Sequence, residues 1–160
     1  NANSPSAPDI RAENVGETRL VIVVRQGHPL TRLKNVTAQR YAAAEHVTVS
    51  RRGNLSNALD DALARLGLTR RVVATAPTEA AALEFARSSD LLVCVPEATT
   101  RSAVTDLGLV VLPLPLELPS APIYLSWHQR YDTDPAHGWL RDLARTALTG
   151  ATRGPSQATR

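Results

Sequence analysis

Short apolar runs and helix-patterned segments alternate along this chain of 160 residues. The apolar runs are rich in valine and leucine, and such continuity is typical of strands that are buried on both faces of a sheet. The segments between them repeat apolar residues at intervals of three or four, as an amphipathic helix does. The pattern predicts strands at residues 19–25, 46–50, 71–76, 91–95, 109–112 and 123–127, and helices at residues 37–44, 54–66, 77–88, 96–107 and 134–148.

Cap and turn residues support these boundaries. Asn54 is expected to cap the helix at residues 54–66, and Gly67 to end it in the left-handed conformation that glycine tolerates best. The proline-rich stretch at residues 113–122 is predicted to be a crossing connection, because proline cannot donate a hydrogen bond within a central strand. One apolar face of the helix at residues 54–66 would contain Leu55, Leu59, Leu63 and Leu66.

The order of the elements predicts an α/β fold with a parallel sheet and right-handed crossovers. In such sheets ligands bind outside the carboxyl ends of the strands, where helix N-termini present free N–H groups. Three strand ends of this kind fall at residues 50–54, 76–79 and 95–97. This edge of the sheet is therefore the first candidate for a binding site.

Composition narrows the classes of function. A hydrophobic content of 43% with 21% charged residues fits an ordinary globular domain, and no apolar run is long enough for a transmembrane helix. The net charge of +3 comes from interspersed acids and bases, so the segment does not indicate a nucleic-acid-binding surface. Cys94 is the only cysteine, which excludes an internal disulfide or a cysteine-based zinc site. The histidines lack metal-ligand spacing and no phosphate-binding glycine loop is present, so neither a metal nor a cofactor is expected.

No catalytic constellation is evident, and an enzyme is not expected. Ser50 follows a strand, but its neighbours are not the glycines that a nucleophile elbow requires. Cys94 lies in an apolar strand and is predicted to be a core residue rather than a reactive thiol. Asp60 and Asp61 are adjacent on a helix and diverge by about 100°, so they do not form a pair of catalytic carboxylates.

Several stretches, in their order and spacing, resemble the effector-binding domain of LysR-type transcriptional regulators. Residues 20–30 look like the family's strand and His-Pro-Leu turn, and residues 47–53 like the first strand and turn of its second subdomain. The strand-to-helix junction at residues 74–83 follows. Residues 91–97 and 109–115 then follow the family's strand, Pro-Glu turn and Leu-Pro-Leu-Pro-Leu crossover. With the returning strand and last helix, the similarity covers about residues 9–148.

The resemblance implies a type 2 periplasmic-binding-protein-like fold, in which two α/β subdomains joined by two crossing strands hold an inducer between them. The family's helix-turn-helix, its linker helix and the opening half of its first subdomain have no counterpart in this sequence. Arg25 and Pro122 would mark the hinge. The implied organisation is a disordered start at 1–8, a partial first subdomain with a hinge strand at 9–28, a complete second subdomain at 29–122, the return strand and last helix of the first subdomain at 123–149, and a disordered tail at 150–160.

The residues expected to bind the inducer are Ser50, Arg51, Asn54, Thr78, Glu79 and Pro96. Hydroxyl donors, a guanidinium and helix N-termini together suit a small organic acid, whereas the carboxylate of Glu79 disfavours an anion. The alternative that the residues leave open is that Asn54 and Thr78 are ordinary helix caps and that Arg51 lies in a solvated turn.

The resemblance implies the ligand-sensing domain of a bacterial regulator that works in the cytoplasm as a homodimer or tetramer. Its partners would be a small-molecule inducer and, through an absent N-terminal domain, DNA. It implies neither a cofactor nor membrane association. The alternative function is a fragment of a solute-binding protein that delivers its ligand to a transporter, because that class shares the architecture.

Overall fold

The computed structural model describes residues 7–152, which form two compact units. Unit 1 contains the described residues up to Arg19 and those from Ser120 onward. Unit 2 is the continuous segment Leu20–Pro119. Unit 2 carries the residues expected to bind a ligand.

The five strands of unit 2 form a mixed sheet in the order β4-β3-β5-β2-β6. The strands β3, β4 and β5 pair in parallel, as the sequence predicts, but β2 runs antiparallel to both β5 and β6. The expectation of a wholly parallel sheet was therefore wrong at β2. The bounds are β2 Leu20–Val24, β3 Glu45–Val49, β4 Arg71–Ala76, β5 Leu92–Pro96 and β6 Val110–Pro113.

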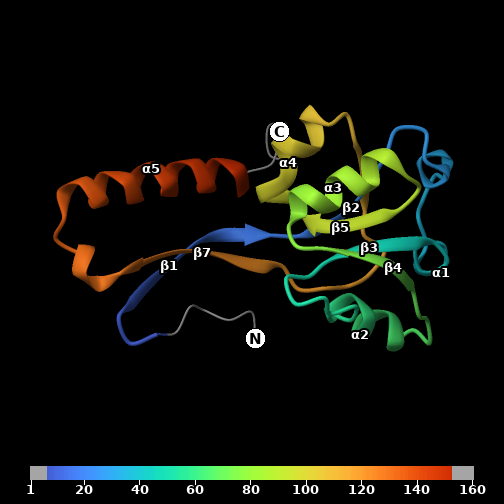
Figure 1. The fold of residues 1–160 in the computed structure, drawn as a ribbon, viewed down its shortest axis with the longest axis horizontal. Helices are drawn as coiled ribbons and strands as arrows, with labels where there is room; N and C mark the ends of the chain where they lie inside the picture. Colours follow the sequence, from blue (N-terminus) through green and yellow to red (C-terminus); the bar gives the residue numbers. More distant parts are fainter. Residues whose placement is uncertain (1–6, 153–160) are drawn as a thin grey trace, which may run out of the picture. The chain divides into compact units, whose positions relative to one another are not determined.

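Helices cover both faces of this sheet (Figure 1), as its continuously apolar strands require. The side chains of Val21 and Val23 lie in a core with α3 and α4, and those of Ile22 and Val24 lie in a second core with α1 and α2. All four valine and isoleucine side chains are buried. The covering elements are the 3-10 helix η1 Pro29–Arg32 and the helices α1 Ala38–Ala42, α2 Ala58–Ala64, α3 Glu79–Ser88 and α4 Glu97–Asp106.

The N-cap of α2 is not the residue that the sequence predicted. Asn57, not Asn54, is the N-cap, because the side chain of Asn57 accepts from Leu59 while the Asp60 carboxylate accepts from the backbone N–H of Asn57. The helix is therefore shorter than predicted: Leu59 and Leu63 are buried, but Leu55 and Leu66 are exposed. Gly67 follows the helix with φ of 68°, as predicted.

Unit 1 consists of a two-stranded antiparallel ladder and one long helix. The strand β1 (Ile10–Thr18) pairs with β7 (Ala121–His128), and the 3-10 helix η2 (Gln129–Tyr131) leads into α5 (Pro135–Thr152). The sequence did not predict β1, because its many polar residues do not form an apolar run. Pro122, inside β7, is tolerated because a two-stranded ladder leaves each strand with an open edge.

The chain crosses between the units at residues 19–20 and 119–120, which differs from the expected organisation. The strand β2 was expected in the first subdomain, but it lies inside the sheet of unit 2. Arg25, expected at the hinge, follows β2 and pairs with Asp90 at 2.6 Å within unit 2. Pro122 lies in β7, two residues beyond a crossing. Of the ends expected to be disordered, residues 1–6 and 153–160 lie outside the described residues, while residues 150–152 continue α5.

Candidate functional site

The carboxyl ends of β3 and β4 are tied together at Ser50. The backbone N–H of Ser50 donates to the carbonyl of Ala76 at 2.8 Å, so the residues after the two strands stay side by side. The chain then makes a tight turn in which Gly53 has φ of 72°. The turn brings the N–H of Asn54 back to donate to Ser50 Oγ at 2.8 Å. Asn54 therefore supports Ser50 instead of starting a helix.

A second hydroxyl is held in the same way after β4. Thr78 is the N-cap of α3, and its Oγ1 accepts from the N–H of Ala81 at 3.2 Å. Each hydroxyl oxygen is thus fixed by a backbone donor, whereas its hydrogen stays available for another acceptor. Ser50 and Thr78 consequently offer two positioned O–H donors at the carboxyl edge of the sheet.

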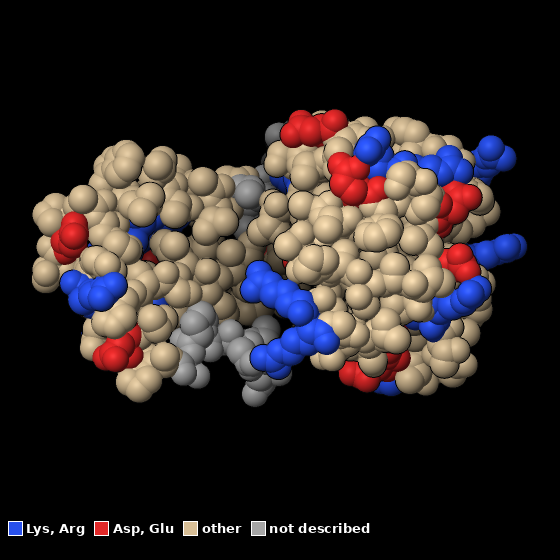
Figure 2. Space-filling view, viewed as in Figure 1, with Lys and Arg blue, Asp and Glu red and all other residues tan. Residues whose placement is uncertain are grey.

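Charged residues directly follow these hydroxyl residues in the sequence. Arg51, Arg52 and Glu79 are all exposed, and none of them forms an ion pair within residues 7–152. Acidic and basic side chains are intermixed over the visible face of unit 2 (Figure 2), so this surface is not of one sign. The guanidinium of Arg51 therefore lies after β3, and the carboxylate of Glu79 lies after the neighbouring strand β4.

The third strand end is organised differently. Pro96 ends β5 and is the N-cap of α4, where it provides no side-chain cap. Its carbonyl accepts from Thr100 Oγ1 at 2.6 Å. Because β5 is parallel to β3 and adjacent to it, Pro96 lies at the same edge of the sheet as Ser50. All six expected ligand residues thus lie at the carboxyl edge of the unit 2 sheet. Asn54 is one of them, although no helix begins at it.

A polar cluster that sequence reasoning missed anchors α2 beside this edge. The Arg70 guanidinium donates to both carboxylate oxygens of Asp60, at 2.8 and 2.9 Å, and its side chain is only 1% exposed. The hydrogen bond from Arg70 holds the pKa of Asp60 below its usual value. Asn57 completes the cluster by donating to Thr48 Oγ1 of β3 at 3.1 Å. A signal was present in the sequence, because Asn57 and Asp60 have the spacing of a capping box.

Tyr41 and His46 fill the core beneath this cluster. His46 Nε2 donates to the carbonyl of Tyr41 at 2.9 Å, which fixes the tautomer and leaves Nδ1 without a hydrogen. Neither that Nδ1 nor the Tyr41 hydroxyl finds a hydrogen-bond partner within the described residues. Burial lowers the pKa of His46 to about 4, so the imidazole is neutral at physiological pH.

Cys94, predicted to be a core residue, is partly buried in β5. Burial still raises the pKa of its thiol to about 12. A thiol with so high a pKa is almost entirely protonated at neutral pH and is a poor nucleophile.

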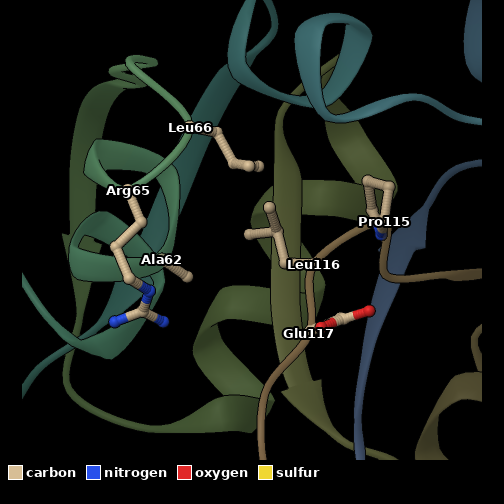
Figure 3. A pocket seen from close by; sticks show the side chains of 6 residues that line it. All are labelled: Ala62, Arg65, Leu66, Pro115, Leu116 and Glu117. Carbon is tan, nitrogen blue, oxygen red and sulfur yellow. The ribbon is translucent and has the colours of Figure 1, made fainter.

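Two grooves lie beside α2, and none of the six expected ligand residues lines either of them. One, of about 480 Å³, lies between α2 and the segment after β6; Figure 3 shows Leu66 and Leu116 pointing toward one another across it. The other, of about 560 Å³, lies beside Asp60 and Arg70. Neither groove is lined by Ser50, Thr78 or Glu79.

The described part of the chain contains neither a candidate metal site nor a helix that could span a membrane. Among residues 7–152, no group of three or more His, Cys, Asp or Glu side chains has an arrangement that could hold a metal ion. No helix within the same residues has the length and apolar character needed to span a membrane.

Comparison with known proteins places the chain in a family. A family model of the LysR substrate binding domain matches residues 2–149. The transcriptional activator NahR of Pseudomonas putida is 33% identical over 127 residues, covering 79% of this chain and 42% of NahR. The probable transcriptional regulator PA0477 of Pseudomonas aeruginosa has a crystal structure that is 32% identical with a TM-score of 0.67, covering 92% of this chain and 47% of that one.

The effector-binding domain of BenM, solved with its effector benzoate, shares the fold at 18% identity and a TM-score of 0.60. The similarity covers 99% of this chain and 72% of that domain. The chain spans less than half the length of the curated relatives it matches. With a family match that spans nearly all of its residues, the chain belongs to the LysR substrate-binding domain family and has that family's type 2 periplasmic-binding-protein-like fold.

Proposed function

We propose that this chain is the effector-binding part of a bacterial LysR-type transcriptional regulator. The observation that carries the proposal is the family match over residues 2–149, combined with the two positioned hydroxyls of Ser50 and Thr78 at the carboxyl edge of the sheet. The curated relatives are transcriptional activators and regulators, which favours this function over delivery of a solute to a transporter. The same relatives favour a binding protein over an enzyme.

The ligand that fits this edge best is a small organic acid. Ser50 and Thr78 have hydroxyl hydrogens to donate to a carboxylate, and Arg51 adds a guanidinium that forms no ion pair within the described residues. Glu79 stands on the same rim and would repel an anion that lacked a donor of its own, so an acid that also carries a hydroxyl or amino group fits better. BenM binds benzoate, a carboxylic acid, on the same fold.

In the proposed mechanism the acid binds at the carboxyl edge of the unit 2 sheet and favours one pose of the two units over another. A ligand shifts such an equilibrium only by the difference between its affinities for the two poses. The altered pose would be relayed within a homodimer or tetramer in the cytoplasm to a separate DNA-binding domain. Residues 19–20 and 119–120, where the chain crosses between the units, are the proposed hinge in place of Arg25 and Pro122.

A thermal-shift screen of small carboxylic acids against the neutral amides of the same compounds tests this proposal. Benzoate and benzamide form the first pair. A ligand present at a hundred times its dissociation constant stabilises the folded state by about 2.7 kcal/mol, which is readily detected. An acid that raises the melting temperature of the wild type but not of Arg51→Ala supports the proposal.

Arg52→Ala is the matched control, because Arg52 is the neighbouring exposed arginine of the same turn. It should retain the response to the acid. Equal responses of the two variants, or stabilisation by the amides alone, would contradict the assignment of the site to Arg51 and an anionic ligand.

A further inference from the structure

Two polar atoms in the interior of unit 2 have no hydrogen-bond partner in the described part of the chain. They are the hydroxyl oxygen of Tyr41, on α1, and Nδ1 of His46, on β3. Both side chains are 0% exposed. Buried polar groups are almost always hydrogen-bonded, because the partner that they lose when they leave water has to be replaced. Two such exceptions in neighbouring side chains therefore require an explanation.

The two side chains contact one another but do not satisfy one another. Their ring centroids lie 4.7 Å apart, and the rings meet edge to face at an angle of 70°. Because Nε2 of His46 donates to the backbone carbonyl of Tyr41 at 2.9 Å, the imidazole cannot turn freely and its Nδ1 is an acceptor. The Tyr41 hydroxyl carries a hydrogen, but it does not form a hydrogen bond with Nδ1. One atom thus needs a donor and the other an acceptor.

The charged groups beside this pair are already occupied. After burial, which is the larger cause, the positive charge of Arg70 lowers the pKa of His46, so the guanidinium lies near the imidazole. Its hydrogen bonds, however, go to both carboxylate oxygens of Asp60. Asp60 in turn accepts a third hydrogen bond from the backbone of Asn57. A guanidinium also has no acceptor, so Arg70 could not take the hydrogen of the Tyr41 hydroxyl.

Solvent comes close to the pair from the groove beside α2. Arg70, which lies near the imidazole, also lines the groove of about 560 Å³. The pairing of β3 with β4 shifts by one residue directly after His46, since His46 lies opposite Val72 whereas Val47 lies opposite Ala74. Such a bulge interrupts the regular ladder between the two strands. The pair therefore lies within one side chain of solvent, although neither ring is exposed.

We propose that one water molecule is bound inside unit 2 between the Tyr41 hydroxyl and Nδ1 of His46. Water is small enough to be enclosed and is both a donor and an acceptor, so one molecule accepts the hydrogen of Tyr41 and donates its own to Nδ1. An ammonium ion fits less well because it cannot accept, and a carboxylate because it cannot donate. The water connects α1 to β3 a second time, beside the hydrogen bond at Nε2. This inference does not depend on the proposed function.

The sign of the stability change in Tyr41→Phe tests the proposal. Removing a buried hydroxyl that has no partner should leave the protein as stable as before or make it more stable. Removing a hydroxyl that holds a water should instead leave the water and Nδ1 poorly bonded. We therefore expect Tyr41→Phe to raise the equilibrium constant for unfolding in urea by about fivefold or more.

Tyr124→Phe is the matched control, because Tyr124 of β7 is half-buried and its hydroxyl forms no hydrogen bond within residues 7–152. It should change the same constant by less than about twofold. A crystal structure of the wild-type chain gives the direct readout, and we expect density for a water within about 3.2 Å of both atoms. A Tyr41→Phe variant as stable as the wild type or more stable would overturn the proposal. A direct hydrogen bond between the hydroxyl and Nδ1, or no density between them, would also overturn it.

Discussion

Replacing Asp60 with asparagine should destabilise unit 2 far more than the same change at its neighbour. Asp60 accepts two hydrogen bonds from Arg70 and one from the backbone of Asn57, whereas Asp61 is exposed and makes no side-chain hydrogen bond or ion pair within the described residues. Asp60→Asn keeps the shape of the side chain and removes its charge. The guanidinium of Arg70, 1% exposed, would then be buried without a counterion.

The magnitude follows from the burial of the two partners. Removing one member of a buried ion pair costs about 3–5 kcal/mol. The Asp60 side chain is 25% exposed, so water can partly replace it and the expected cost is near the lower end, about 3 kcal/mol. Asp61→Asn should change the free energy of unfolding by less than about 0.5 kcal/mol. Arg70→Met removes the buried charge itself and should therefore cost less than Asp60→Asn.

Native-state hydrogen exchange at the backbone amides of β3 and β5 is the appropriate assay, because it reports the opening of unit 2 separately from unit 1. The pKa of Asp60 is lowered in the folded protein, so its contribution is present above the usual value of 3.8 and is lost as the pH falls below it. The difference in free energy of unfolding between Asp60→Asn and the wild type should therefore become smaller at acidic pH. Exchange free energies for Asp60→Asn and Asp61→Asn that agree within about 0.5 kcal/mol would refute this reasoning.

Three further outcomes are expected. The pKa of His46 falls from 6.5 to about 4 on folding, so unit 2 should lose about 3 kcal/mol of stability as the pH drops from 6.5 to 4. In urea unfolding curves, His46→Gln should remove this dependence of stability on pH. If the dependence persists in the variant, other groups cause it. Cys94, with a pKa of about 12, should react with a thiol reagent in the native protein many times more slowly than in urea, and comparable rates would contradict its burial. Gly67→Ala, at φ of 68°, should cost about 1 kcal/mol, whereas Gly150→Ala inside α5 should stabilise the protein slightly; equal effects in thermal melts would count against the conformational argument.

The sequence predicted the elements of unit 2 well, because strands covered on both faces give continuous apolar runs. The same continuity hides strand direction: β2 has an equally apolar pattern whether it runs parallel or antiparallel to β5. The strand β1 was missed for the opposite reason, since a strand of a two-stranded ladder has many exposed positions and contains Glu13 and Asn14. The hydrophobic pattern of a sequence therefore indicates which strands are buried, but it does not indicate the direction in which they run.

The cap of α2 shows what a finer reading of the sequence could have found. Asn54 and Asn57 are both good cap residues three positions apart, but only Asn57 is followed at the third helical position by an acid, Asp60. The pairing of Asp60 with Arg70 depends on the loop after Gly67 returning to the start of the helix, and no local pattern predicts such a return. The strand ends of the candidate site were predictable, because chain order alone places them at one edge of a parallel sheet.

We propose above all that the carboxyl edge of the unit 2 sheet binds a small organic acid. The most direct test is a titration of the ¹⁵N-labelled chain, followed by ¹H–¹⁵N correlation spectra, with benzoate first and then any acid that the thermal screen identifies. The largest shifts should occur at the amides of Ser50, Arg51 and Thr78, and Arg51→Ala should weaken the affinity for the acid at least tenfold. Shifts confined to the groove between α2 and Leu116, or equal affinities of the wild type and Arg51→Ala, would contradict it.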